Sequence, residues 1–270
     1  MSGADPYEAA EDAIQSRLDE SLHPRGPEML YQHVASADLG PESTLLDLGC
    51  NMGKHSFELH RRFGCHVVGV DIDAYYIERA VALLASHPRF QDAVVFRVGS
   101  VDAIPADDNS FDLVWCRDVL ELVDNLARTY GEINRVLKPS GRAVIYTMCA
   151  TDLMEPQEAG RLYARLSGIK APSMLSANHE EAIAGAGLKV VETDMLGPEW
   201  GEFDQEHTGK PAKCLLQVAR LLRSRAAFVR EFGEANYEVA IADRLWHVYR
   251  MIGKLAGHMY VLEKLADPST

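Results

Sequence analysis

LLDLGCNMG, at residues 45–53, is the stretch that decides the fold. Its leucines and aspartate are typical of the end of a buried parallel strand, and its two glycines predict a tight turn. Residues 54–63 follow with the pattern of a helix. A strand, a glycine-containing turn and a helix N-terminus together predict a site for a nucleotide-like ligand, because the backbone can approach the ligand and the helix offers free N–H groups.

The spacing of the glycines separates this turn from a dinucleotide-binding turn, which reads G-x-G-x-x-G after a strand. Only three residues lie between Gly49 and Gly53, so the middle glycine is missing and the last one comes a residue early. Asn51 stands where a glycine is expected, and asparagine tolerates a positive φ better than other non-glycine residues. The spacing therefore argues against an oxidoreductase that uses a nicotinamide cofactor.

A second buried strand is predicted at residues 66–71 and ends in Asp71. Asp71 lies 22 residues after Gly49, close to the separation of about 20 expected for a carboxylate that binds ribose hydroxyls. A carboxylate suits a diol because it accepts two O–H hydrogen bonds at once. The alternative interpretation is a solvent-exposed carboxylate at the end of a strand.

Three further stretches complete the pattern. They read GSVDAIP at residues 99–105, DNSFDLVWCRDVLEL at residues 108–122 and EINRVLKPSGR at residues 132–142. With the first stretch, they resemble the ordered motifs of class I S-adenosylmethionine (SAM) methyltransferases of the small-molecule, natural-product type. The resemblance covers about residues 40–147. It implies an α/β fold with a doubly wound, mostly parallel seven-stranded sheet, SAM as cofactor and S-adenosylhomocysteine (SAH) as product.

The resemblance also implies which residues bind the cofactor. The first loop would contact the methionine half of SAM through Asp47, Gly49, Cys50, Asn51 and Gly53. Asp71 would bind the ribose, and Ile72 would pack on the adenine. Ser100 and Val101 occupy the positions of the family's adenine clamp. Arg117 falls in the turn that passes under the methionine arm.

Two positions depart from the family pattern. Ser100 replaces an aspartate that holds the adenine amino group, and a hydroxyl accepts that hydrogen bond more weakly. Leu122 replaces a histidine that faces the substrate in relatives, which removes the simplest candidate for a catalytic base. Glu121 in the same turn is then the candidate catalytic residue, with a capping or helix-face carboxylate as the alternative. His55 is expected on the surface, and no set of side chains has the spacing of a metal site.

The composition is that of an ordinary globular protein. The chain has 270 residues, 47% hydrophobic content and a net charge of −13. Because a negative chain repels nucleic acid and anionic membranes, we expect a small-molecule partner, no nucleic acid and no membrane, and we leave a homodimer open. Arg220, Arg223, Arg225 and Arg230 are expected on the solvated face of one helix. Five cysteines without a C-x-x-C pair fit reduced thiols and a cytoplasmic location.

Four segments are expected along the chain. Two helices at residues 1–38 would form a lid, and a cofactor-binding core would span residues 39–196 with a small insertion at residues 148–177. A helical cap at residues 197–256 would cover the substrate site, and residues 257–266 would add the last strand. The core strands are predicted at residues 44–48, 66–71, 94–98, 111–116, 141–147 and 189–195.

The cap supplies the candidate substrate contacts Trp200, Phe203 and Trp246. Residues 199–206 are acidic and aromatic, so they are expected to hold a cationic amine, to stack on a flat substrate or to fasten the cap. Leu215, Val218, Leu222 and Val229 recur at helical spacing and predict one buried face of the cap.

Methyl transfer from SAM needs alignment of the acceptor above all, and positioning of this kind contributes about 7–11 kcal/mol in favourable cases. We therefore predict methyl transfer to a small, mainly apolar organic acceptor, in natural-product biosynthesis. Oxygen is the first choice of acceptor atom, and nitrogen or carbon are the alternatives. The rival interpretations are a SAM- or SAH-binding protein that has lost methyl transfer, such as a cyclase or a binding module, and a nucleic-acid methyltransferase. The charge and the lack of an N/D-P-P-Y tetrapeptide argue against the latter.

Overall fold

The computed structural model describes residues 6–265 of the chain, and the first and last five residues lie outside the described part. Residues 1–5 of the predicted N-terminal segment and residue 266 of the predicted last strand therefore lie outside the described residues. Within the described range, no helix is long and apolar enough to cross a membrane.

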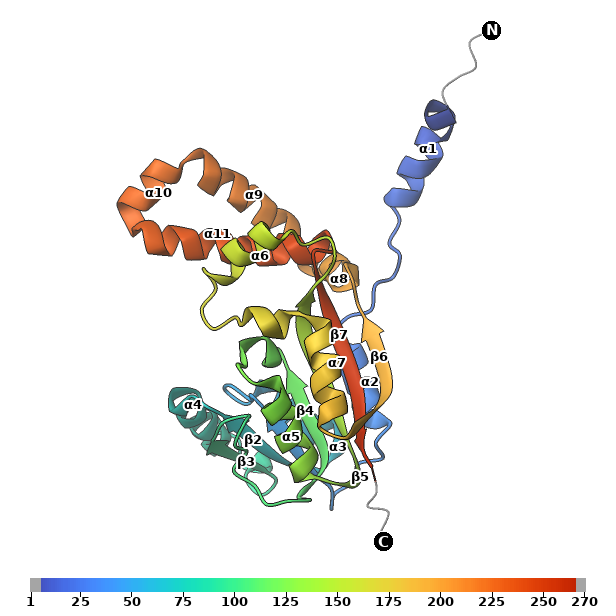
Figure 1. The fold of residues 1–270 in the computed structure, drawn as a ribbon, viewed down its shortest axis with the longest axis vertical. Coiled ribbons are helices and arrows are strands. Elements are labelled where there is room, and N and C mark those ends of the chain that lie inside the picture. The colour runs from blue at the N-terminus through green and yellow to red at the C-terminus, as the bar shows by residue number, and fades with distance from the viewer. Residues whose placement is uncertain (1–5, 266–270) are drawn as a thin grey trace.

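One seven-stranded sheet, in the order β3-β2-β1-β4-β5-β7-β6, forms the centre of the molecule (Figure 1). Its strands are β1 (Thr44–Leu48), β2 (His66–Asp71), β3 (Val94–Val98), β4 (Phe111–Arg117), β5 (Leu137–Ala150), β6 (Leu188–Met195) and β7 (Leu255–Lys264). Strands β1 to β5 pair in parallel, and β7 runs antiparallel to both β5 and β6. This sheet confirms the predicted mostly parallel, doubly wound α/β fold.

Helices and short 3₁₀ turns connect the strands. The α-helices are α1 (Pro6–Leu18), α2 (Glu28–Ala35), α3 (Lys54–Phe63), α4 (Ala74–Ala85), α5 (Leu126–Val136), α6 (Pro156–Tyr163), α7 (Ser176–Gly185), α8 (Glu199–Thr208), α9 (Lys210–Arg223), α10 (Arg225–Phe232) and α11 (Glu234–Met251). The 3₁₀ turns within residues 6–265 are η1 (Pro88–Phe90), η2 (Leu120–Leu122) and η3 (Ala171–Met174).

Two apolar layers bury the two faces of the sheet, because successive residues of a strand point to opposite faces. Leu45 and Trp115 belong to the layer that packs with α2, α3 and α4. Leu46 and Val114 belong to the layer that packs with α5 and α7. Figure 1 shows α5 and α7 on the near face of the sheet.

The strand order reverses at β1, which lies between β2 and β4. Ligands of open parallel sheets bind outside the carboxyl ends of the strands at such a reversal. The turn at residues 49–53 follows β1, and α3 begins directly after it. The fold therefore places the glycine-containing turn at the expected ligand site.

Four helices, α8 to α11, lie between β6 and β7. Figure 1 shows α9, α10 and α11 projecting from the sheet as a separate arm, with α1 extending away on its own. Because α1 points away from the sheet, α2 is the N-terminal helix that packs beside the ligand site. The lid role of the N-terminal helices stays a prediction.

The predicted apolar face of the cap is wrong in detail. Val218 is buried, but the neighbouring Leu215 and Leu222 are 56% and 62% exposed. Cys214 and Leu221 are buried instead. The chain turns at Ser224, which ends α9, so the four arginines predicted for one helix are divided between α9 and α10.

Candidate active site

The turn after β1 has the left-handed backbone that its sequence allows. The φ angles of Gly49 and Gly53 are 79° and 82°, and that of Asn51 is 49°. A Cβ atom on Gly49 would lie 2.2 Å from Cγ2 of Val119, and one on Gly53 would lie 2.4 Å from Cζ of Phe96. The turn therefore packs directly against the turn after β4 and against β3, with no room for side chains at either glycine.

Asp71 links this turn to the end of β2. The Asn51 N–H donates to Oδ2 of Asp71 at 2.8 Å, and the Asp73 N–H donates to Oδ1 at 2.9 Å. Each carboxylate oxygen keeps a second lone pair for a hydroxyl donor. Ile72 follows directly and is 73% exposed. The carboxyl end of β2 thus presents the Asp71 carboxylate, held by two backbone N–H groups, beside the exposed side chain of Ile72.

The residues of the predicted adenine clamp lie after β3. The Ser100 hydroxyl donates to Oδ1 of Asp102, so its lone pairs stay available to an amino group. Val101 lies between these two residues and is half-buried. The sequence motif did not indicate Asp102, whose carboxylate accepts the hydrogen bond from the Ser100 hydroxyl at the clamp position.

The residues at this edge fit SAM. A carboxylate suits the ribose, an exposed isoleucine suits a purine face, and the α3 N-terminus lies at the turn. Asp47 and Cys50 lie beneath the turn, at 2% and 4% exposure. Asp47 accepts a hydrogen bond from the Ser56 hydroxyl and so ties α3 to β1. Burial raises the pKa of Asp47 to about 7.

An aromatic cluster lies on the α2–α3 face of the sheet. We define it as Tyr31, His55, Trp115, Tyr146 and Trp200. Tyr31 stacks on Trp115 with 5.0 Å between ring centroids, and Tyr146 stacks on Trp200 with 4.3 Å. The indole N–H groups of Trp115 and Trp200 are buried and have no hydrogen-bond acceptor among the described residues.

His55 joins this cluster from the first turn of α3. Its Nδ1 lies 2.8 Å from the Tyr31 hydroxyl, and its ring lies 5.7 Å from that of Trp115. Burial, together with the positive charges of Arg117 and Lys54, lowers the pKa of His55 to about 4. The expectation of a surface histidine is wrong: the ring is half-buried and neutral near pH 7.

Arg117 brings a cationic group to the same place. Its guanidinium carbon lies 5.6 Å from the Trp200 ring and 5.9 Å from the Tyr146 ring. Its Nε donates to Oδ2 of Asp118 at 3.1 Å. The structure therefore unites a predicted cofactor residue, Arg117, with a predicted substrate residue, Trp200.

Comparison with known proteins matches residues 46–145 to a methyltransferase domain. Sterol 24-C-methyltransferase from Gibberella zeae is 30% identical over 172 residues, which are 62% of this chain and 45% of that protein. The chain spans less than half the length of the curated relatives it matches.

Solved structures share the fold. Geranyl diphosphate C-methyltransferase from Streptomyces coelicolor A3(2), in complex with Mg²⁺, geranyl-S-thiolodiphosphate and SAH, has a TM-score of 0.65 at 20% identity, over 88% of this chain and 74% of that chain. The [4+2]-cyclase SpnF has a TM-score of 0.68 at 17% identity, over 97% of this chain and 95% of that chain.

Residues 46–145 of this chain belong to the class I SAM-dependent methyltransferase domain family. The predicted family and the predicted cofactor, SAM, are thereby confirmed. The similarity to proteins named as methyltransferases also supports an enzyme. The roles of individual residues stay predictions. The positions of Glu121, Phe203 and Trp246 in the structure bear on three of them.

Glu121 lies on the opposite side of the sheet from the aromatic cluster. It is 5% exposed, and its Oε2 accepts a hydrogen bond from the Thr147 hydroxyl at 3.0 Å. Thr147 and the cluster residue Tyr146 are neighbours in β5 and so point to opposite faces. Burial, together with the charge of Asp118, raises the pKa of Glu121 to about 8. This placement argues against the predicted role of Glu121 as the catalytic base.

The Glu121→Gln variant is expected to change how stability depends on pH. The unfolded carboxyl loses its proton near its ordinary pKa, whereas the folded one keeps it until about pH 8. Between these values the folded state binds more protons, so the free energy of unfolding of the wild type falls as the pH rises. At about 1.4 kcal/mol per unit of pKa, the fall is on the order of 3–5 kcal/mol.

Glutamine stays neutral, so the variant gains stability relative to the wild type as the pH rises through this window. Urea unfolding at about pH 5 and pH 8.5 measures the effect. Glu181→Gln, at an exposed position of α7, is the control and should show no such gain. Equal pH slopes for Glu121→Gln and the wild type would contradict the buried, protonated carboxyl.

The acidic, aromatic segment at residues 199–206 contacts the N-terminal segment. Arg25 forms ion pairs with Glu199 at 2.8 Å and with Asp194. Phe203 stacks on His207, and a Cβ atom on Gly26 would lie 2.3 Å from the Phe203 ring. These contacts favour the fastening role over a site for a cationic amine.

Trp246, the third predicted substrate residue, is half-buried in α11. It packs at the edge of the core layer that contains the aromatic cluster. Among residues 6–265, no group of histidine, cysteine, aspartate and glutamate side chains could hold a metal ion.

Proposed function

We propose that this chain transfers the methyl group of SAM to a hydroxyl of a small, mainly apolar organic molecule, in natural-product biosynthesis. The observation that carries the proposal is the aromatic cluster with a neutral histidine, Tyr31–His55, beside the cofactor turn. When bound, SAM supplies an electrophilic methyl group. The residues of the chain then have to orient the acceptor, exclude water and take up one proton.

The side chains of the cluster suit an apolar acceptor that carries oxygen. Stacked rings offer flat apolar contact area, which favours a ring or an unsaturated chain. A buried N–H without an acceptor costs free energy, so the indole groups of Trp115 and Trp200 favour a ligand oxygen that accepts from them. A lipid-like or polyketide-like alcohol combines both properties.

The low pKa of His55 favours oxygen over nitrogen as the acceptor atom. A hydroxyl that attacks the methyl group becomes a strongly acidic oxonium, which gives its proton even to a weak base. A methylated ammonium holds its proton too tightly for such a base. The Tyr31 oxygen can accept a hydrogen bond from Nδ1–H of His55, which leaves the Nε2 lone pair free for the proton.

The His55→Ala variant tests this proposal. We expect kcat to fall by about 10²-fold or more, the usual contribution of a positioned base, while SAH affinity stays unchanged. Tyr31→Phe keeps the stacking on Trp115 but removes the hydroxyl, so a smaller loss is expected. His66→Ala, at the exposed start of β2, is the control. Release of SAH with a panel of apolar alcohols, phenols and amines is the measurement.

The pH profile separates a base from a merely structural residue. The wild-type rate should be flat from about pH 6 to 9, because His55 is unprotonated throughout. The His55→Ala rate should rise with pH, since hydroxide replaces the missing base. Turnover with amines only would overturn the choice of a hydroxyl acceptor, and a wild-type rate with a flat pH profile in His55→Ala would overturn His55 as the base.

A SAM-binding protein without methyl transfer is the second candidate. The structural likeness to the cyclase SpnF and the leucine at position 122 favour it. It predicts SAH binding with no SAH release from SAM on any acceptor. Methylation of nitrogen or carbon is a third outcome, which the same acceptor panel distinguishes.

A further inference from the structure

We propose that the arm formed by α9 and α10 binds the surface of an anionic lipid bilayer. We call residues 210–232 the basic arm. It contains no residue of the cofactor turn or of the aromatic cluster. Figure 1 shows it projecting from the sheet together with α11. The proposal rests on its charge, on its exposed leucines and on a cavity between it and α11.

The charge of the basic arm is opposite to that of the chain. Residues 210–232 contain six lysines and arginines and a single acid, Glu231, in a chain whose net charge is −13. Arg225 is paired with Glu234, and the other five cations form no ion pair with any described residue. A patch of this sign would face an anionic surface while the rest of the molecule is repelled.

Exposed leucines alternate with these cations. Leu215, Leu216 and Leu222 are 56%, 51% and 62% exposed. On a helix, Arg220 follows Leu216 by four residues, and Arg223 follows it by seven, so all three share one face. An outer face of leucines flanked by arginines is typical of helices that lie in a membrane interface. It also explains why the predicted inward face of these leucines is wrong.

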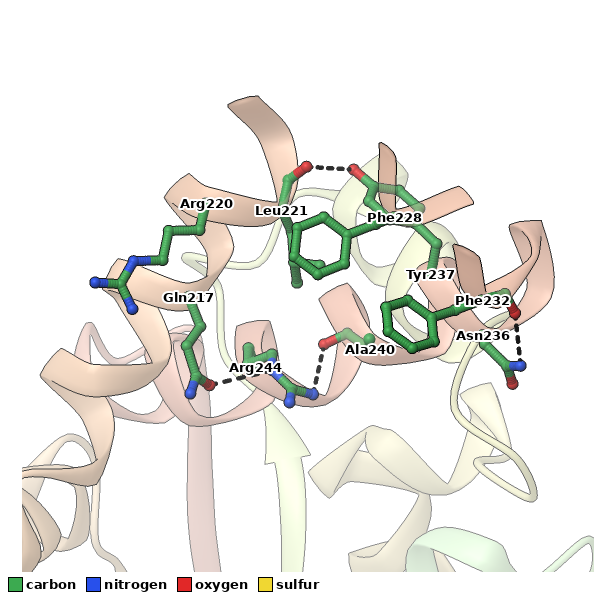
Figure 2. A pocket seen from close by; sticks show the side chains of 9 residues that line it. All are labelled: Gln217, Arg220, Leu221, Phe228, Phe232, Asn236, Tyr237, Ala240 and Arg244. Atoms are coloured by element: carbon green, nitrogen blue, oxygen red, sulfur yellow. Dashed lines mark hydrogen bonds between the residues drawn. The ribbon is translucent and has the colours of Figure 1, made fainter. Parts of the chain in front are cut away.

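A cavity of about 490 Å³ lies between the basic arm and α11. Figure 2 shows the side chains that line it. Phe228 and Phe232 from α10 and Leu221 from α9 line it, and Arg220 lies at its edge. An apolar opening beside an arginine can take an acyl chain while the arginine binds the phosphate. The mixture of leucines and phenylalanines with cations favours a bilayer over nucleic acid, whose surface offers no apolar partner.

The arm would lie on the bilayer and not cross it, since no described helix is long and apolar enough to span a membrane. The expectation of no membrane partner rested on the total charge and on the interpretation of Arg220, Arg223, Arg225 and Arg230 as a solvated helix face. The charge is unevenly distributed, and a local patch decides contact with a surface because screening limits charge interactions to about 10 Å.

Flotation with lipid vesicles tests the proposal on the full chain. The vesicles consist of phosphatidylcholine alone or of phosphatidylcholine mixed with phosphatidylglycerol. We expect binding to the anionic vesicles only, weakened by added salt. Each lysine or arginine near an anionic surface contributes about fivefold, so Arg220→Glu/Arg223→Glu should bind at least about 25-fold more weakly. Leu215→Ser/Leu222→Ser should also bind more weakly, but with unchanged salt dependence.

The charge-matched control is Lys189→Glu/Arg89→Glu, at exposed positions outside the arm. It should bind vesicles like the wild type, and all variants should retain SAH binding and the wild-type unfolding temperature. Equal binding to both vesicle types, or wild-type binding by Arg220→Glu/Arg223→Glu, would overturn the proposal. Equal or tighter binding to a double-stranded oligonucleotide would show a general polyanion surface and overturn the lipid assignment.

Discussion

Gly49→Ala is expected to weaken SAH binding and to destabilise the protein by about 1–3 kcal/mol. The residue has a φ of 79°, and its added Cβ atom would lie 2.2 Å from Cγ2 of Val119. Because Val119 belongs to the turn after β4, the clash pushes two ligand-site turns apart. We expect SAH affinity to fall by at least about tenfold, which corresponds to 1.4 kcal/mol.

Gly64→Ala is the matched control for this prediction. Gly64 also has a positive φ, 68°, but its Cβ atom would meet nothing within 4 Å. Both variants therefore share backbone strain, and only Gly49→Ala carries the clash. Adding Val119→Ala to Gly49→Ala should recover part of the affinity. Calorimetric titration with SAH and urea unfolding are the measurements, and equal SAH affinity in the two glycine variants would contradict the geometry.

Asp71→Ala is expected to lower SAH affinity by about 10²-fold or more. Its carboxylate accepts hydrogen bonds from the N–H groups of Asn51 and Asp73 and keeps lone pairs for the ribose. Hydrogen bonds to a charged group contribute about 1.5–3 kcal/mol each, so losing the ribose contacts alone accounts for the loss. Asp71→Asn keeps one acceptor oxygen and should lose less.

Asp107→Ala, at an exposed loop position, is the control for a lost surface charge. Thermal unfolding without ligand separates loss of affinity from loss of fold. If Asp71→Ala binds SAH as tightly as the wild type, then Asp71 does not hold the ribose and the assignment fails.

Local patterns in the sequence were sufficient to predict the strands of the sheet and the conformation of the cofactor turn. Buried parallel strands are short apolar runs, and the positive φ angles of residues 49, 51 and 53 match glycine or asparagine. The spacing from Gly49 to Asp71 follows from a strand, a helix and a second strand of ordinary length. These features depend on neighbours in the sequence, so one chain is enough to predict them.

The aromatic cluster depends on contacts between distant segments, so it was not predictable. Tyr31 and His55 are 24 residues apart, and their hydrogen bond exists because α2 packs across the start of α3. A histidine next to a charged helix face looks like a surface residue in the sequence. The pairing of Trp200 with Tyr146 likewise depends on how α8 returns to β5.

In the basic arm, the periodicity of the sequence predicted the wrong buried face of a helix. Leu215 and Leu222 lie at helical spacing with the buried Val218, so periodicity alone assigns them to a core. The buried set is shifted around the helix toward Cys214 and Leu221, where α11 packs. Periodicity shows that a helix has an apolar side, but the partner helix decides which side is covered.

Calorimetric titration of the wild-type chain with SAM, SAH and NAD tests the central claim most directly. Membership in this family, with Asp71 and the turn at residues 49–53 as the cofactor site, predicts that SAM and SAH bind at one site and that NAD does not. Absence of SAM and SAH binding, or a preference for NAD, would contradict a SAM-dependent methyltransferase.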